Sequence, residues 1–139
     1  MSDIKIENDN RKAILEALKE QTHNALLDVG MIASGDVAEF MQGEGIVDTG
    51  LLRNSITFAM DGEPANISSY SASKGDGKGS YSGSAPKTEQ PTVYIGTNVE
   101  YAKWVQYGTS KMTKRDFMFA PLRANLGEYR KIIEKYLKG

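Results

Sequence analysis

The fold of this chain depends on residues 11–42, RKAILEALKEQTHNALLDVGMIASGDVAEFMQ. Apolar side chains recur there at gaps of four, seven, four and three residues, at Ile14, Leu18, Ala25, Val29 and Ile32, with Leu15, Leu26 and Leu27 beside them. These gaps match one face of a helix with 3.6 residues per turn and predict a long amphipathic helix. Asp9 or Asn10 can cap its start. Gly30 and Gly35 each weaken it by roughly 1 kcal/mol relative to alanine, so a break into two helices stays open.

Two short segments after this helix alternate in polarity as β-strands do. They are residues 55–61 and 92–97, and each carries apolar side chains at every second position. The segment between them, 68–88, is rich in serine and glycine, with Tyr70 and Tyr81 as its large apolar groups. Such a composition buries too little apolar area to offset the entropy lost on ordering. We therefore predict an antiparallel strand pair with a flexible, structureless loop, 68–88, at its tip.

The last third of the chain predicts two more helices. Residues 99–107 form the first, with Asn98 as N-cap and Gly108 as the left-handed residue that ends it. Pro121 suits the first position of the second helix, where a missing amide is tolerated. The apolar face of that helix is predicted at Leu126, Tyr129, Ile133, Tyr136 and Leu137. Its opposite face is basic, with Arg123, Arg130, Lys131, Lys135 and Lys138.

Length and composition indicate a single domain over residues 1–139. A chain of 15.3 kDa can bury roughly 68% of the surface that its extended form exposes, which is enough for one core. We predict an α/β domain of the α+β type, with a small antiparallel sheet packed against the long N-terminal helix and the C-terminal helix. The longest apolar run has four residues, 117–120, which excludes a membrane-spanning helix. The first residues lack the basic and apolar regions of a signal peptide.

Charge is uneven along the chain, although the net charge is only -1. Residues 1–50 carry ten acidic and four basic side chains, whereas residues 101–139 carry three acidic and nine basic. Three interpretations stay open. The subunit could be dipolar and meet a neighbour end to end, a basic tail could contact nucleic acid, or two helices could simply have solvated polar faces.

Three short motifs suggest chemistry, and their surroundings argue against each. Residues 47–50, Val-Asp-Thr-Gly, match an aspartic protease signature but follow a long helix instead of a strand. Residues 74–80 resemble a phosphate-binding loop, but Gly79 separates the lysine from the serine. His23 has no nucleophile or base beside it, and the chain has no cysteine. We therefore expect that the protein is not an enzyme and that it binds neither a metal ion nor a cofactor.

Three pieces of sequence, in this order, resemble the tail-completion family of long-tailed bacteriophages, the head–tail joining or tail-terminator proteins. They are residues 47–56 (VDTGLLRNSI), residues 93–102 (VYIGTNVEYA) and residues 104–109 (WVQYGT) leading to Phe117. The matching positions are Asp48, Thr49, Gly50, Leu52, Arg53, Ser55, Ile56, Gly96, Tyr101, Ala102, Tyr107, Gly108, Thr109, Phe117 and Pro121. Two positions depart from the family: an acidic residue is common where Gln106 stands, and a proline often stands before the Asp-Thr-Gly turn.

The resemblance implies a ring of identical copies, expected to be a hexamer, that completes the tail and joins it to the head. Its partners would be the tail tube protein and the head-completion or connector proteins, with DNA only passing through the lumen. The ring would lie at the head–tail junction of the virion, without a membrane, after assembly in the host bacterial cytoplasm. The candidate assembly contacts are Tyr70, Lys74, Lys78, Tyr81, Arg123 and Arg130.

The motif residues themselves are expected to be structural. Gly50 and Gly108 meet backbone requirements, and Asp48 can pair with Arg53 within the turn. We favour a core position for at least one of three aromatic residues, which are Tyr101, Trp104 and Tyr107.

Two other functions remain possible from sequence. A connector-side head-closure adaptor or stopper would also form a ring but would bind the portal stack. A nucleic-acid-binding module would use the basic C-terminal helix, although the pI of about 5.9 argues against it.

Overall fold

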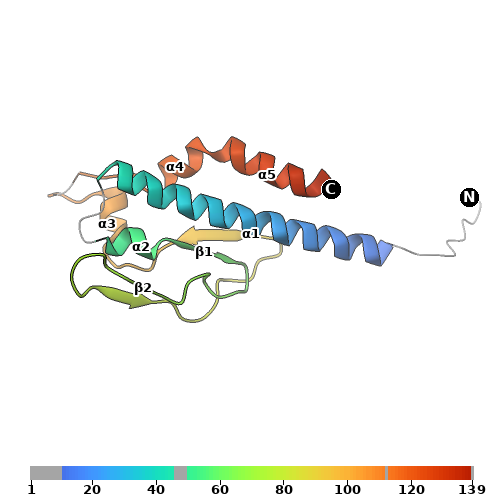
Figure 1. Ribbon diagram of the computed structural model, residues 1–139, viewed down its shortest axis with the longest axis horizontal. Coiled ribbons are helices and arrows are strands. Elements are labelled where there is room, and N and C mark those ends of the chain that lie inside the picture. The colour runs from blue at the N-terminus through green and yellow to red at the C-terminus, as the bar shows by residue number, and fades with distance from the viewer. Residues whose placement is uncertain (1–10, 46–49, 112, 139) are drawn as a thin grey trace, which may run out of the picture.

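The computed structural model describes residues 11–45, 50–111 and 113–138 (Figure 1). It confirms the α+β class, because a long N-terminal helix, α1 (Arg11–Gly43), and a C-terminal helix, α5 (Leu126–Lys138), accompany a small antiparallel sheet. The other elements, in chain order, are α2 (Leu51–Ser55), β1 (Thr57–Met60), β2 (Ser69–Ser71), β3 (Lys78–Ser80), β4 (Val93–Gly96), α3 (Ala102–Tyr107) and α4 (Phe119–Ala124).

The predicted strand pair is present. β1 and β4 run antiparallel, with Thr57 opposite Gly96 and Met60 opposite Val93. Successive side chains of a strand point to opposite faces, and Phe58 and Met60 are both buried. In Figure 1, α1 lies between this sheet and α5. The sheet and α5 therefore share α1 as their common support.

Helix α1 is continuous through both glycines. At Gly30, side chains of β1 and β4 pack closely against the helix backbone. A Cβ atom at Gly30 would lie 2.5 Å from Cδ2 of Phe58 and 2.9 Å from Cγ2 of Val93. Both distances are too short for real atoms, so the missing side chain lets one residue of each strand approach the helix backbone. At Gly35, by contrast, a Cβ atom would meet nothing within 4 Å. The sequence left open a break of this helix into two at these glycines, and the structure shows a single helix instead.

The predicted apolar face of α1 is only partly buried. Ala25 and Val29 are buried as predicted, but the first ten residues of the helix, 11–20, are all exposed. The predicted core residues that are exposed instead are Ile14, Leu15, Leu18, Leu27 and Ile32. Figure 1 shows that the start of α1 extends past the sheet and past the end of α5, which explains the exposure of the first ten residues. Leu27 and Ile32 stand farther along the helix, beyond this projecting part.

The C-terminal predictions need three corrections. Helix α3 begins at Ala102, and Asn98 does not cap it but bonds to other parts of the chain. Pro121 is the third residue of α4 instead of the first residue of a longer helix, because the chain turns at Asn125 before α5 begins. Two predicted core positions of α5 are exposed, namely Leu126 and Leu137.

The Ser/Gly-rich segment contains regular structure that its composition did not predict. β2 and β3 pair as an antiparallel hairpin, with Ser69 opposite Ser80 and Ser71 opposite Lys78. The prediction of a structureless loop is therefore wrong for this part of 68–88. The predicted flexibility of the segment is not tested by this pairing alone, and the hydrogen bonds that hold the hairpin to the rest of the chain argue against it.

We predict opposite effects on stability from two alanine substitutions in α1. Gly30→Ala should lower the free energy of unfolding by about 1–3 kcal/mol, because the new methyl group overpacks the contact with Phe58. Gly35→Ala is the matched control and should raise it by up to about 1 kcal/mol, since alanine favours helix and the site is open. Urea unfolding of both variants measures this. Equal gains in both would contradict the close packing at Gly30.

Candidate assembly surface

The described part of the motif 47–56 begins at a left-handed glycine. Gly50 has φ of +82°, and a Cβ atom there would lie 2.7 Å from Oγ of Ser73 in the hairpin. Both facts favour glycine. Asp48 and Thr49 lie outside the described residues, as does the predicted pair of Asp48 with Arg53.

Ser55 joins α2 to the sheet and to the hairpin. It is fully buried, and its Oγ donates to the carbonyl oxygen of Leu52 at 2.6 Å. The same Oγ lies 2.5 Å from Oγ1 of Thr97, just after β4. The hydroxyl of Tyr81 donates to the carbonyl oxygen of Ser55 at 2.5 Å. One small motif residue thus connects three segments that are far apart in sequence.

Asn98 provides a second connection to the hairpin. Its Nδ2 donates to the carbonyl oxygen of Ser80 at 2.8 Å, and its Oδ1 accepts from the hydroxyl of Tyr70 at 2.5 Å. The rings of Tyr70 and Tyr81 lie 5.5 Å apart at a tilt of 53°. Burial raises the pKa of both tyrosines, which keeps their hydroxyl groups protonated as donors.

These contacts divide the predicted assembly residues of the hairpin into two kinds. Tyr70 and Tyr81 are half-buried, and their hydroxyl groups bond within the subunit. Lys74 and Lys78 are exposed. Only the lysines are thus open to contact from a partner over their whole side chains.

Asp116 organises the chain between α3 and α4. Its Oδ1 accepts from Nε2 of buried Gln106 at 2.6 Å and from the amide nitrogens of Phe119 and Ala120 at 3.0 and 3.2 Å. Its Oδ2 accepts from Nη2 of Arg123 at 2.7 Å. The bond from Gln106, followed by those from Arg123 and the two amides, holds the pKa of Asp116 below its usual value. Sequence reasoning noted Gln106 only as a departure from the family pattern and missed Asp116, since neither stands on an apolar period.

The remaining predicted residues take structural or exposed positions. Phe117 and Pro121 are buried, and Gly108 has φ of +78° at the end of α3. Arg130 is exposed on α5. The other motif residues that are buried or half-buried are Leu52, Arg53, Ile56, Gly96 and Ala102, whereas Thr109 is exposed.

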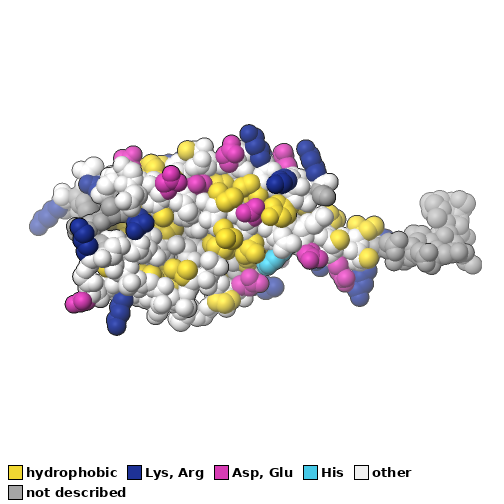
Figure 2. All heavy atoms as spheres, viewed as in Figure 1, with side chains coloured by type: hydrophobic (Ala, Val, Ile, Leu, Met, Phe, Trp, Pro, Cys, Tyr) yellow, Lys and Arg dark blue, Asp and Glu magenta, His cyan; other side chains and the backbone are white. Residues whose placement is uncertain are grey.

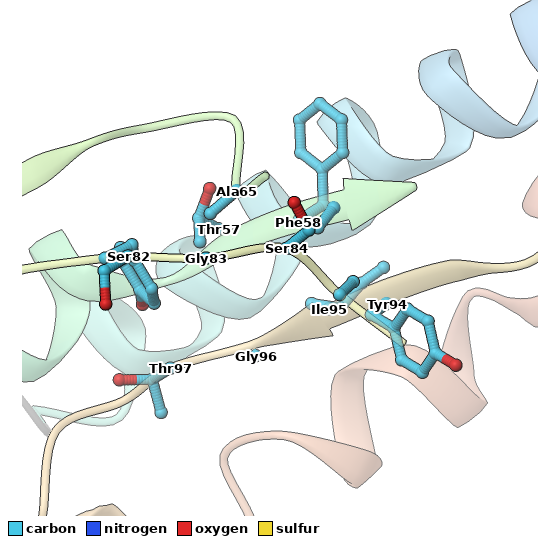
Figure 3. Close-up of a pocket in the computed structure, with 13 residues that line it drawn as sticks. Thr57, Phe58, Ala65, Ser82, Gly83, Ser84, Tyr94, Ile95, Gly96 and Thr97 are labelled. Carbon is cyan, nitrogen blue, oxygen red and sulfur yellow. The ribbon is translucent and has the colours of Figure 1, made fainter. Parts of the chain in front are cut away.

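A pocket of about 230 Å³ lies between the β1–β4 sheet and the loop that follows β3 (Figure 3). Thr57, Tyr94 and Gly96 line it from the sheet, and residues 82–85 line it from the loop. Its ionisable groups are tyrosines, without a carboxylate, amine or imidazole.

Three aromatic residues, one just before α3 and two on it, form an exposed row. Tyr101, Trp104 and Tyr107 are spaced by three residues, and 37%, 47% and 67% of their surfaces are exposed. The preference for a core position for one of them is wrong, because α3 turns Ala102 and Gln106 inward instead. Nζ of Lys103 lies 5.5 Å from the ring centre of Trp104.

A second exposed apolar group lies at the start of α1. Ile14, Leu15 and Leu18 share one face of the helix and are 57%, 58% and 44% exposed. Figure 2 shows yellow side chains along this projecting part of α1. In Figure 1, α3 and the start of α1 lie at opposite ends of the longest axis.

Opposite charges do not mark these two ends. The acidic first part of the chain and the basic last part lie side by side, because α1 and α5 pack antiparallel (Figure 1). The hydroxyl of Tyr129 donates to Oδ2 of Asp36 at 2.7 Å, and that of Tyr136 donates to Oδ2 of Asp28 at 3.2 Å. Within α1 and α5 the acidic and basic side chains are therefore not separated to opposite ends, and the interpretation of a dipolar subunit stays a prediction for the whole chain.

No group of three or more metal-binding side chains occurs in the described ranges. Within the same ranges, no helix is long and apolar enough to cross a membrane. Comparison with known protein families, curated proteins and solved structures finds no match.

We predict that the hairpin is docked in the isolated protein. The amides of Ala72 and Tyr81, which donate to Gly77 and Ser68, should exchange hydrogen more slowly than that of exposed Asp76. Tyr81→Phe should speed their exchange by roughly two- to ten-fold, the effect of losing one hydrogen bond of about 0.5–1.5 kcal/mol. Tyr107→Phe removes an exposed hydroxyl group and is the control. Fast exchange in the wild type would instead favour a mobile loop.

We predict a pH dependence of stability from Asp116. Its pKa in the folded state lies below the ordinary value of 3.8, so its contribution is fully present above about pH 5. That contribution is lost as the pH falls through the lowered value, since the folded state must then accept a proton against its four donors. Asp116→Asn should flatten the fall in melting temperature below pH 4. Glu128→Gln makes the same change of net charge at an exposed site and is the control; equal flattening there would refute the role of Asp116.

Proposed function

We propose that this chain is a structural subunit of a long-tailed bacteriophage. Its copies assemble into a ring, expected to be hexameric, that completes the tail and joins it to the head. The ring contacts the tail tube protein on one side and the head-completion or connector proteins on the other, and DNA passes through its lumen. It performs no reaction and resides in the virion after assembly in the host bacterial cytoplasm.

One observation carries this proposal: the elongated subunit exposes large apolar side chains at both ends. Aromatic residues are enriched at protein interfaces, and contiguous exposed apolar groups mark interaction sites more often than chance surface. Different patches at opposite ends favour head-to-tail contacts, which close into a ring when the rotation between copies permits.

The roles of the matched motif residues are consistent with the resemblance to tail-completion proteins. Leu52, Ser55 and Phe117 are buried where α2, the sheet and α3 meet. Such residues maintain the fold and perform no chemistry, as expected of a family whose function depends on shape and contacts. The resemblance supplies the phage context, and the exposed patches supply the reason for assembly.

Electron microscopy of the purified protein, alone and mixed with phage tails that lack their terminator, tests the proposal. We expect rings at the ends of tail tubes, and tails that become competent to join heads. Rings that bind only heads would favour the connector-side adaptor instead. A protein that binds neither would contradict both, and DNA binding that falls steeply with salt would favour the nucleic-acid-binding module.

A further inference from the structure

The β1–β4 sheet has one face covered by α1 and a second face that borders a cavity. Residues paired directly across two antiparallel strands have side chains on the same face, so Thr57 shares a face with Gly96, and Phe58 shares the other with Ile95. Phe58 packs on α1 at Gly30, which places Thr57 and Gly96 on the face away from the helix. The cavity of about 230 Å³ in Figure 3 lies on that face.

The loop that closes the cavity is held at both of its ends. The amide of Tyr81 donates to the carbonyl oxygen of Ser68 at 2.9 Å, and the amide of Ala85 donates to the carbonyl oxygen of Glu63 at 2.8 Å. Residues 82–84 cross the sheet between these two positions (Figure 3). The cavity is therefore already formed in the chain alone, as most small-molecule sites are.

Small residues on both walls leave this space open. A Cβ atom at Gly96 in the sheet, or at Gly83 in the loop, would meet nothing within 4 Å. A cavity of about 150 Å³ accepts one benzene ring, so the volume here suits one ring with a small substituent. The other small residues of the lining are alanines and serines, namely Ala59, Ala65, Ala85, Ser82 and Ser84.

One polar atom at the cavity lacks a partner. Thr57 lines the cavity and is only 6% exposed, and its Oγ1 has no hydrogen-bond partner within the described residues. Buried polar side-chain atoms are nearly always paired, so an unpaired hydroxyl group calls for an explanation. This oxygen can move among three staggered positions about the Cα–Cβ bond, and it can both donate and accept. A ligand in the cavity would supply the missing partner.

The lining also limits the charge of such a ligand. Its ionisable groups are the hydroxyls of Tyr81 and Tyr94, and burial raises the pKa of Tyr81, so that hydroxyl stays neutral. A charged ligand would lose its water without gaining an ion pair. The rings of the same two tyrosines offer faces and edges to an aromatic ligand.

We propose that this cavity binds a small neutral aromatic molecule that carries one hydroxyl group. The ring lies among the small residues of the lining and beside Tyr94, and the hydroxyl group pairs with Oγ1 of Thr57. This site goes beyond the assembly of copies and does not depend on it.

Titration with p-cresol tests the site, with the amide signals of Gly83, Ser84 and Gly96 followed in two-dimensional NMR spectra. Toluene differs from p-cresol only by the missing hydroxyl group. We expect saturable binding of p-cresol that is about two- to ten-fold tighter than that of toluene, the effect of one ordinary hydrogen bond. Benzoate has a similar size but a negative charge, and it should not saturate the site.

Two variants separate the space from the hydrogen bond. Gly96→Leu places a side chain in the cavity and should abolish saturable binding of both p-cresol and toluene. Gly127→Leu is the control at an open position of α5 and should leave binding unchanged. Thr57→Val keeps the shape of the side chain without its hydroxyl group, so p-cresol should bind it no more tightly than toluene does. The same variant should raise the melting temperature of the free protein, because a buried unpaired hydroxyl group is removed.

Three results would overturn the proposal: no saturable binding of p-cresol, equal binding of benzoate, or binding that a folded Gly96→Leu variant retains. An unchanged preference for p-cresol in Thr57→Val would refute the assigned hydrogen bond. A lower melting temperature of Thr57→Val would show that its hydroxyl group is already paired, and would also count against the site. All of these measurements use the isolated protein, so none of them depends on whether copies form a ring.

Discussion

The close approach of the sheet to the backbone of α1 at Gly30 is the constraint on which the rest of the structure depends. A two-stranded sheet is marginal alone and needs a covering surface. Phe58 and Val93 find that surface where α1 has no side chain. This contact fixes the position of the sheet along the helix, and α5 packs on another side of the same stretch. Because both partners gather near the middle and end of α1, its first ten residues are left projecting.

Sequence periodicity predicted which faces of the helices are apolar, but it could not predict how far their partners extend. Leu18 and Val29 have the same place in the period, and only Val29 is covered, because Val29 packs in the cluster with Ala33 and Tyr129. The pairing of β1 with β4 was predictable because alternation and the length of the intervening segment leave few other topologies. The long helix was predictable as well. Gly30 lowers the helix propensity of this segment, but in the folded chain the packing of Phe58 and Val93 requires it.

The hairpin and α3 were harder to predict, for a shared physical reason. Composition scores a segment by the apolar area it can bury, whereas the hairpin is held by the hydroxyl groups of Tyr70 and Tyr81 and by the amide of Asn98. In α3, the buried face contains Ala102 and Gln106, and the large aromatic residues face outward. A rule that places aromatic residues inside fails where a polar side chain finds a buried partner and the aromatic surface is free for another contact.

The pairing of Gln106 with Asp116 makes the choice of residue at each of these two positions depend on the other. Nε2 of Gln106 donates to the carboxylate while its Oε1 accepts from the amide of Met118 at 3.0 Å, so both ends of the buried amide are satisfied. A carboxylate at position 106 could still accept from Met118, but it would face Asp116 at 2.6 Å without a proton between them. An acidic residue there therefore requires a donor or neutral residue in place of Asp116, or one shared proton. The residues at positions 106 and 116 therefore constrain each other, and Gln106 fits Asp116 because its amide can donate to the carboxylate.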